Sequence, residues 1–145
     1  MKKLSVVIDT NVIVSSLRSK RGASFKLLTL LVEDLFEFSI SVPLVLEYES
    51  VLIRNLEDKH YNNTDVDDFI NYLCKIGKKR KVHFLWRPFL KDPKDDMVLE
   101  LAIESNSDYI ITFNKKDFVG IDKFGKEVLT PSEFIKKPQE KKWVY

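Results

Sequence analysis

The sequence predicts an α/β fold of three layers, in which helices cover both faces of a mostly parallel central sheet. The first observation is the run LSVVI at residues 4–8, which is continuous, apolar and β-branched, as in a strand buried on both faces. The second is that strand-like runs alternate with segments of helical periodicity, which implies right-handed β-α-β crossovers. The third is the length of 145 residues, which is about that of one domain. We therefore expect a single domain over 1–137 and a polar tail over 138–145.

The first half of the chain predicts two strands that each precede a helix. Between residues 22 and 36, apolar residues recur at helical spacing after a Gly-Ala-Ser start that could cap a helix. The short run at 36–41, FEFSIS, alternates between apolar and polar residues as a strand does. A helix over 42–58 follows, with Pro43 well placed for its first turn.

The second half predicts further alternation of helices and strands. Residues 62–79 carry a helix start at Thr64, before an acidic first turn, and a helix stop at Gly77. Asp92 and Pro93 are suited to the cap and the first residue of a later helix. The remaining expected elements are a strand at 81–86, a helix through 97–105, a strand at 108–113, a loop at 114–118, a strand at 127–130 and a helix at 131–137.

Composition excludes several classes of protein. A hydrophobic fraction of 44% and an aromatic fraction of 12% are typical of a folded chain rather than a disordered one. The net charge of +2 is too small to indicate a nucleic-acid partner by itself. Cys74 is the only cysteine, which suits a reducing cytoplasm, and no apolar stretch approaches the roughly 20 residues of a membrane span. We expect a cytoplasmic protein without a membrane segment.

Acidic and amide side chains follow several predicted strands at the point where each strand ends. These residues are Asp9 after the first strand, Asp95 and Asp96 in a later helix start, and Asn114 and Asp117 after YIITF. Catalytic groups of parallel sheets gather at the carboxyl ends of the strands, so these side chains would meet if their strands are neighbours. Each group also fits a local role, as a helix cap, an acidic first turn or a turn.

The helix predicted at 42–58 contains two glutamates. At about 100° per residue, Glu49 falls inside the apolar arc of the helix, whereas Glu47 lies at its border. Burying a carboxylate is costly unless it is paired or bound to a metal, so an acid on this face needs an explanation. Periodicity therefore favours Glu49 as the unusual residue.

Together, these segments resemble the PIN domain ribonucleases, in particular bacterial PIN proteins regarded as toxins of toxin-antitoxin pairs. The segments that carry the resemblance span nearly the whole chain: VVIDTNVIVSSL, VPLVLEYESVL, DPKDDMVLELAIESNSDYIITFNKKDF and VLTPSEFI. The resemblance implies one PIN-like domain with endoribonuclease activity. It also implies an RNA substrate, a cognate antitoxin and a homodimer.

The resemblance also assigns residues to a site. It places the acidic positions at Asp9, Glu47, Asp95 and Asp117, and so it favours Glu47 over Glu49. The neighbours given supporting roles are Asn11, Asp96, Thr112 and Asn114, of which Asp96 is the one most easily confused with Asp95. Some relatives have Asp at the position of Asn114, and others have Asn there with an acid three residues later. We expect the second arrangement, with Asp117 as the fourth acid and Asn114 assisting it.

Converging carboxylates predict a bound cation, because they repel one another and raise one another's pKa. Oxygen ligands point to Mg²⁺ or Mn²⁺, whereas one cysteine and two separated histidines, His60 and His83, offer no zinc pattern. A divalent ion held by the four acidic residues could lower the pKa of water and polarise a phosphodiester. The expected reaction is metal-assisted phosphodiester hydrolysis.

Basic residues near this acidic centre would be needed to hold RNA phosphates. The candidates are Arg18, Lys20 and Arg21; Lys78, Lys79, Arg80 and Lys81; and Lys115 and Lys116. For any single lysine, a solvated surface position is the simpler interpretation. Unpaired bases could stack on exposed aromatic side chains such as Trp86.

Two other functions are compatible with the sequence. One is a non-catalytic PIN-type module that binds RNA or a protein without cutting, which the ambiguity at Asn114 leaves open. The other is an unrelated α/β domain, such as a receiver or a phosphatase, that would form an aspartyl-phosphate. DTNV lacks the second acid, two residues after Asp9, that such a phosphatase uses. The sequence has no Walker A or G-x-G-x-x-G motif to support another phosphate chemistry.

Overall fold

The computed structural model describes residues 3–19, 21–56, 61–83 and 89–137. Within these ranges the chain forms one sheet of five parallel strands in the order β3-β2-β1-β4-β5. The strands are β1 (Ser5–Ile8), β2 (Glu37–Ile40), β3 (Lys78–Lys79), β4 (Tyr109–Ile111) and β5 (Glu127–Leu129). The predicted fold class is therefore confirmed.

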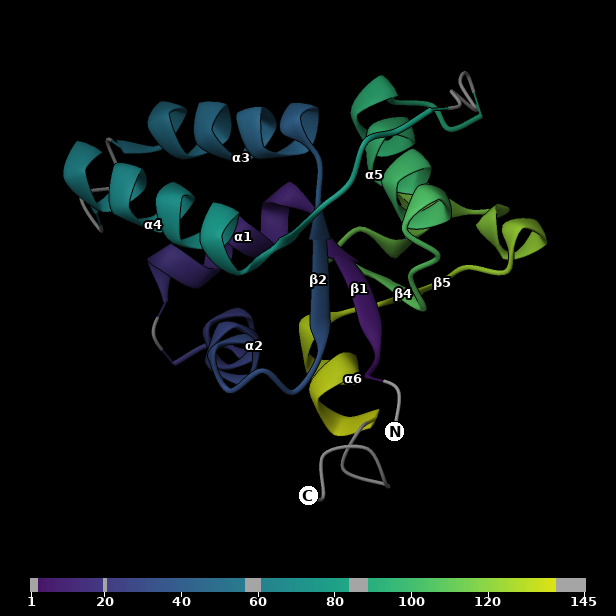
Figure 1. Cartoon of the computed structure of the whole chain (residues 1–145), viewed down its shortest axis with the longest axis horizontal. Coiled ribbons are helices and arrows are strands. Elements are labelled where there is room, and N and C mark those ends of the chain that lie inside the picture. The colour runs from purple at the N-terminus through teal and green to yellow at the C-terminus, as the bar shows by residue number, and fades with distance from the viewer. Residues whose placement is uncertain (1–2, 20, 57–60, 84–88, 138–145) are drawn as a thin grey trace.

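Helices cover both faces of this sheet and produce the three predicted layers (Figure 1). α1 to α4 lie on one side and α5 lies on the other, while α6 packs against α2 and β5. The helices are α1 (Thr10–Arg18), α2 (Ala23–Val32), α3 (Val42–Arg54), α4 (Asn63–Ile76), α5 (Pro93–Glu104) and α6 (Pro131–Lys136). Two short 3-10 helices, η2 (Lys115–Phe118) and η3 (Ile121–Phe124), lie between β4 and β5. No helix in the described ranges combines the length and the apolar composition that a bilayer span requires.

β1 is the central strand, because it pairs with β2 along one edge and with β4 along the other. Val6, Val7 and Ile8 have no exposed surface, as the continuous apolar run predicts for a strand covered on both faces. The chain leaves β1 toward β2 and returns later to β4 on the opposite side. In parallel sheets this reversal opens a crevice at the carboxyl ends of the two central strands.

The register of β1 and β4 aligns the residues that follow these strands. Ile8 pairs with Ile111, so Asp9 and Thr112 are the next residues on neighbouring strands. The backbone N–H of Asp9 donates to the Ile111 carbonyl at 2.9 Å, which extends the ladder by one residue. The two strands whose ends were expected to share a site are therefore neighbours.

The helix α1 is absent from the sequence prediction, which passed from the first strand directly to the helix that begins near residue 22. Its sequence, TNVIVSSLR, contains three β-branched apolar residues that disfavour a helix in isolation. Tertiary packing overrides this preference, because Val12, Ile13 and Val14 are all buried. Asp9 caps the helix and so starts it immediately after β1.

Three further predictions about elements are wrong. The strand that follows α4 is β3, at Lys78–Lys79, rather than 81–86. Residues 81–83 are outside any strand, and 84–86 lie outside the described residues. β3 is an edge strand with exposed lysine side chains, so no apolar alternation marks it. The helix α4 is capped by Asn62 and Asp65 instead of starting at Thr64, and the expected loop at 114–118 contains η2.

Candidate active site

Asp9 connects the end of β1 to the first turn of α1. Its side chain is 8% exposed, and one carboxylate oxygen accepts a hydrogen bond from the Thr10 N–H at 2.8 Å. The Thr112 hydroxyl donates to the other oxygen at 2.7 Å. The local capping role that the sequence allowed is therefore correct, but it occupies only one of the two oxygens.

Thr112 joins the loop after β4 to the first turn of α1. Its hydroxyl oxygen is fully buried and accepts the Asn114 backbone N–H at 3.1 Å and Asn11 Nδ2 at 3.4 Å. Asn11 Nδ2 also lies 3.4 Å from Asp9 Oδ2, and Asn11 Oδ1 accepts the Phe113 N–H at 3.3 Å. Asn11 and Thr112 thus hold the Asp9 carboxylate and the loop in one arrangement, and their supporting role in the reaction stays a prediction.

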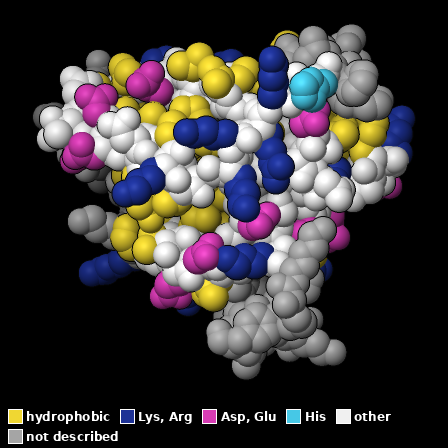
Figure 2. Space-filling view, in the orientation of Figure 1, with side chains coloured by type: hydrophobic (Ala, Val, Ile, Leu, Met, Phe, Trp, Pro, Cys, Tyr) yellow, Lys and Arg dark blue, Asp and Glu magenta, His cyan; other side chains and the backbone are white. Residues whose placement is uncertain are grey.

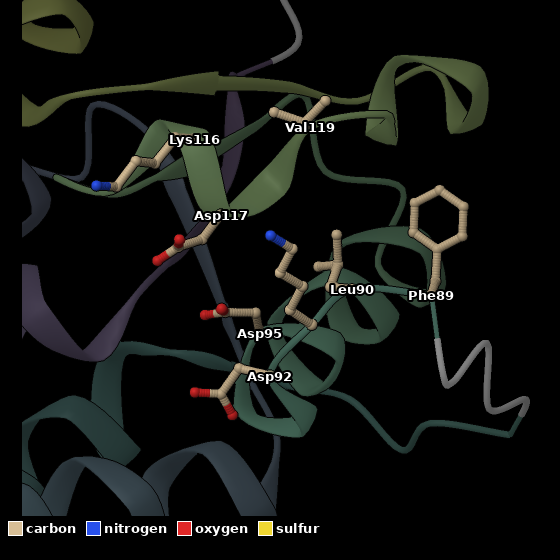
Figure 3. A pocket seen from close by; sticks show the side chains of 8 residues that line it. Phe89, Leu90, Asp92, Asp95, Lys116, Asp117 and Val119 are labelled. Atoms are coloured by element: carbon tan, nitrogen blue, oxygen red, sulfur yellow. The ribbon is translucent and has the colours of Figure 1, made fainter.

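A pocket of about 610 Å³ opens between the start of α5 and η2. Asp92 and Asp95 line it from the α5 side, and Lys116 and Asp117 line it from η2. The carboxylates of Asp92, Asp95 and Asp117 face the same side of this pocket (Figure 3). The fold thus brings two of the four predicted acids, Asp95 and Asp117, to one cavity.

The pKa of Asp95 is strongly raised by its surroundings. Its partial burial is the main cause that raises its pKa, and the charge of Asp9 is the next. The charges of Asp92, Asp117 and Asp96 add to these effects, so that the pKa of Asp95 reaches about 7. A carboxyl group at the mouth of a pocket with such a pKa is typical of a functional site.

Asp9 belongs to the same electrostatic cluster. Burial raises the pKa of Asp9, whereas the hydrogen bonds from Thr112 and Thr10 lower it. The charges of Asp117 and Glu47 raise it further. Asp9 therefore interacts electrostatically with the other three predicted acids, Glu47, Asp95 and Asp117.

Glu47 reaches this cluster from α3. The next residue, Tyr48, is fully buried, and its hydroxyl donates to the carbonyl of the last residue of β1, which fixes this turn of α3 beside the end of that strand. Glu47 Oε2 lies 3.4 Å from Lys94 Nζ on α5, and the two side chains are 16% and 55% exposed. Glu49, which periodicity favoured, is partly buried. The α3 glutamate whose charge acts on Asp9 is Glu47.

Asp96 binds backbone groups, whereas its neighbour Asp95 lines the pocket. It is 1% exposed, and its Oδ1 accepts the backbone N–H groups of Leu90 at 2.8 Å and Phe89 at 3.3 Å. These bonds anchor the segment before α5, which supplies part of the pocket wall. Successive residues of a helix point about 100° apart, so only one of two adjacent acids faces the cavity. Asp96 supports the site indirectly, through the backbone.

The loop after β4 brings Asp117 to the pocket that Asp95 also lines. The charge of Asp117 acts on both Asp9 and Asp95. Asn114 contributes through its backbone: its carbonyl accepts the Asp117 N–H at 3.0 Å, and its N–H donates to Thr112. The role of Asp117 as the fourth acid, with Asn114 assisting, stays a prediction.

The chemistry of this cluster suits a hard divalent cation, since its donors are carboxylate oxygens. Among the described residues, no three Asp, Glu, His or Cys side chains already converge as a set of metal ligands. Asp9, Asp95 and Asp117 nevertheless lie within electrostatic range of one another, and their repulsion would be relieved by a cation. A shared ion therefore requires side-chain movement, which exposed Asp117 and half-buried Asp95 permit more readily than buried Asp9.

The basic residues predicted near the site have different surroundings. Lys116 lines the acidic pocket, whereas Lys115 Nζ pairs with Glu133 at 3.0 Å. Arg18 Nη2 donates to Asn55 Oδ1 at 3.0 Å, between α1 and the end of α3. Arg21 is exposed, and Lys20 lies outside the described residues, as do Trp86, His60 and the tail 138–145.

The run Lys78–Lys81 lies at the outer edge of the sheet. The Arg80 N–H donates to the Ile40 carbonyl at 2.8 Å, which places the run at the carboxyl end of β2. Lys78 pairs with Glu37 at 3.4 Å, and Lys79, Arg80 and Lys81 are exposed. β3 is two strands from β1, or about 10 Å. Figure 2 shows basic side chains spread over the middle of the face where the chain crosses from α4 toward α5.

Sequence reasoning missed three side chains at this site: Tyr48, Lys94 and Phe113. The sequence could have indicated a partner for Lys94. A lysine in the first turn of a helix is unfavourable beside the positive end of the helix dipole, unless a nearby acid compensates its charge. Tyr48 is an aromatic residue on the apolar face of its helix, where periodicity does not distinguish it from a core residue. Phe113 ends an apolar strand run, yet its side chain is 47% exposed beside Asn11.

Comparison with known proteins adds one finding to this geometry. A family model described as PIN domain matches residues 5–116. The matched span includes Asp9, Glu47 and Asp95 and ends one residue before Asp117. A search of curated proteins found no match.

Proposed function

This chain belongs to the PIN domain family, and on that premise we propose that it is a metal-dependent endoribonuclease that hydrolyses RNA phosphodiesters. Membership of the family implies nuclease function and RNA binding in general. The observation that supports the finer proposal is the electrostatic coupling of Asp9, Asp95 and Asp117 at the carboxyl ends of β1 and β4. Glu47 adds a fourth carboxylate from α3.

The four carboxylates would together hold Mg²⁺ or Mn²⁺. When bound, such an ion supplies charge neutralisation at the scissile phosphate and lowers the pKa of a water molecule. The protein's own contribution is orientation: Thr10 and Thr112 fix both oxygens of Asp9, and their hydrogen bonds favour its ionised form. Asp95 and Asp117 present further carboxylates across the pocket.

Lysines can balance charge at this acidic centre. Lys94 pairs with Glu47 on one side, and Lys116 lines the pocket beside Asp117. A phosphodiester entering the pocket would meet Lys116 and also Lys91, which lines the same pocket, and these cations would offset the repulsion from the carboxylates. The exposed lysines and arginine of 79–81 lie further along the same edge of the sheet and would contact more distant phosphates.

The proposal is tested by a ribonuclease assay on single-stranded RNA with Mg²⁺, Mn²⁺ or EDTA. We expect EDTA to abolish cleavage and Asp9→Asn and Asp95→Asn each to lower it by about 100-fold. Asp96→Asn is the matched control, because it keeps the Oδ1 acceptor for Phe89 and Leu90. Cleavage that survives both substitutions contradicts the mechanism, and RNA binding without cleavage would assign the chain to the non-catalytic class.

We further propose that the nuclease is the toxin of a toxin-antitoxin pair and acts as a homodimer. Its expression in bacteria should then arrest growth, and Asp9→Asn should remove the arrest. Co-expression of the product of an adjacent small gene should restore growth and yield a complex with this chain. Light scattering of the purified protein measures the dimer directly. Growth that is unaffected by the active protein contradicts the toxin role but leaves the nuclease proposal standing.

A further inference from the structure

A second cavity lies beside Asn11, whose side chain contacts Asp9 of the acidic cluster. It has a volume of about 400 Å³ and is formed by α1, the end of α3 and Phe113 of the loop after β4. We call it the Phe113 groove. Asn11 belongs to both places: it lines this groove, and its side chain contacts Asp9 and Thr112. One side chain, that of Asn11, therefore connects the groove to the Asp9 carboxylate.

The walls of the groove combine one aromatic face with a polar rim. Phe113 is 47% exposed, which is unusual for a large aromatic side chain directly after a buried strand. Val14 and Val51 add apolar lining from α1 and α3. Arg18 and Asn55, which are hydrogen-bonded to each other at 3.0 Å, form the polar rim.

Hydrogen bonds of the backbone and of the preceding residue fix the position of Phe113. Its N–H donates to Asn11 Oδ1 at 3.3 Å, and the preceding residue, Thr112, is fully buried and bonded to Asp9. The aromatic ring is therefore attached to a rigid segment whose other contacts hold the carboxylate of Asp9. A ligand stacked on this ring would have a fixed position relative to that carboxylate.

These features match an unpaired nucleotide. A volume of about 400 Å³ is near the lower end for small-molecule sites, so it suits a single base rather than a helix or a protein segment. A base offers a flat π-face for Phe113, and its adjoining phosphate offers negative charge for Arg18. In a duplex the base faces are stacked on their neighbours, so only a single-stranded region could supply such a ligand.

We propose that the Phe113 groove binds one unpaired base of the RNA strand whose backbone crosses the acidic pocket. The base stacks on Phe113, and the Arg18–Asn55 rim contacts its edge and the adjoining phosphate. The inference rests on the proposed function for the identity of the ligand as RNA. It adds a subsite for one base beside the acidic pocket and names Phe113 as the residue that forms it.

The test measures binding separately from cleavage. Asp9→Asn is used as the parent protein, so that the RNA stays intact. The probes are a fluorescein-labelled single-stranded RNA of eight nucleotides and the same strand annealed to its complement, and affinity is measured by fluorescence anisotropy. The variants added to the parent are Phe113→Ala, Phe113→Trp and, as a matched exposed aromatic on α4, Tyr72→Ala.

We expect Phe113→Ala to weaken single-strand binding by roughly 5- to 100-fold, the range for loss of one stacked base. Phe113→Trp should restore the affinity of the parent, because it keeps an aromatic face, and Tyr72→Ala should leave the affinity unchanged. Duplex binding should not respond to Phe113→Ala. Phe113 is half exposed, so its truncation removes little core packing, and circular dichroism verifies the fold of each variant.

The outcomes separate this inference from the proposed function. If the native chain cuts RNA but Phe113→Ala binds the single strand like its parent, the groove inference is wrong and the nuclease stands. If the native chain cuts no RNA but Phe113→Ala loses affinity, the groove inference stands and the catalytic proposal is wrong. A parent protein that binds no single-stranded RNA, or a Phe113→Ala loss equal for duplex and single strand, overturns the groove inference.

Discussion

At the scale of single residues, the candidate site depends on how one carboxylate is held. Asp9 is almost buried, and burial alone would raise its pKa and favour its neutral form. The hydrogen bonds from the Thr10 N–H and the Thr112 hydroxyl oppose that effect. Thr112 is therefore a positioning residue: it acts on the chemistry through Asp9, and it also fixes the loop that carries Asp117.

The first prediction concerns the hydroxyl of Thr112. Thr112→Val keeps the shape of the side chain but removes the donor to Asp9, so the pKa of Asp9 should rise. The free energy of unfolding should fall by about 1–3 kcal/mol, because the buried carboxylate loses a partner. NMR titration of the Asp9 carboxyl carbon measures the pKa, and urea denaturation measures the stability.

Thr112→Ser is the matched control for this prediction. Serine keeps the hydroxyl and loses only a methyl group, so it can cost some packing energy but should leave the pKa of Asp9 near its native value. The acidic limb of the cleavage rate should move to higher pH in the valine variant only. Equal Asp9 pKa values in the two variants would contradict the positioning role.

At the scale of elements, α3 places one glutamate at the site through a contact made by its neighbour. Tyr48 is fully buried and donates to the backbone carbonyl at the end of β1, so this turn of α3 cannot rotate freely. Glu47 then faces Asp9 and pairs with Lys94 of α5. Lys94 is 55% exposed, so its pair with Glu47 should add less than about 1 kcal/mol to stability. Its importance would lie in charge placement.

The second prediction separates Glu47 from Glu49 on this helix. Glu47→Gln should lower cleavage by about 10-fold or more, because it removes one of the four carboxylates proposed to hold the metal, and the free energy of unfolding should change by less than about 1 kcal/mol. Glu49→Gln, on the same helix, should leave cleavage within about twofold. Cleavage rates at saturating Mg²⁺ and urea denaturation measure both quantities. Equal losses in the two variants would mean that α3 contributes only general negative charge.

At the scale of the whole molecule, the acidic cluster couples the site to folding stability. The folded state raises the pKa of Asp95 from 3.8 to about 7, so between these values the folded chain binds more protons than the unfolded chain. Stability must then decrease as pH rises through this window. The raised pKa of Asp9 contributes with the same sign. At neutral pH the ionised carboxylates therefore lower the free energy of unfolding. A bound cation would reduce their repulsion and so stabilise the folded chain.

The third prediction follows from this linkage. In EDTA, the free energy of unfolding of the native chain should fall as pH rises from 5 to 8, by about 1 kcal/mol after solvent screening of the partly exposed Asp95. Asp95→Asn should flatten this slope and should be the more stable protein at pH 8. Mg²⁺ should stabilise the native chain at pH 8 more than the variant. Urea denaturation at each pH tests all three expectations, and a stability that rises over this window in both proteins would refute them.

The sequence by itself determined the α/β class and the core strands. The run LSVVI is apolar at four of its five positions, and only a strand covered on both faces buries all four of these side chains. Asp92 and Pro93 marked the start of α5 correctly, because the Asp92 side chain accepts a hydrogen bond from the nearby Lys94 N–H. Such interactions are local, so a short stretch of sequence contains both partners.

Only the tertiary structure decided which residues share the site. Asp9 and Thr112 are more than a hundred positions apart, and their hydrogen bond depends on the pairing of β1 with β4. Periodicity favoured Glu49, but the position of α3 is set by Tyr48 against β1, and Glu47 is the residue that faces Asp9. α1 forms despite its β-branched residues because packing buries them. These outcomes depend on contacts between distant segments, which local patterns in a single sequence do not specify.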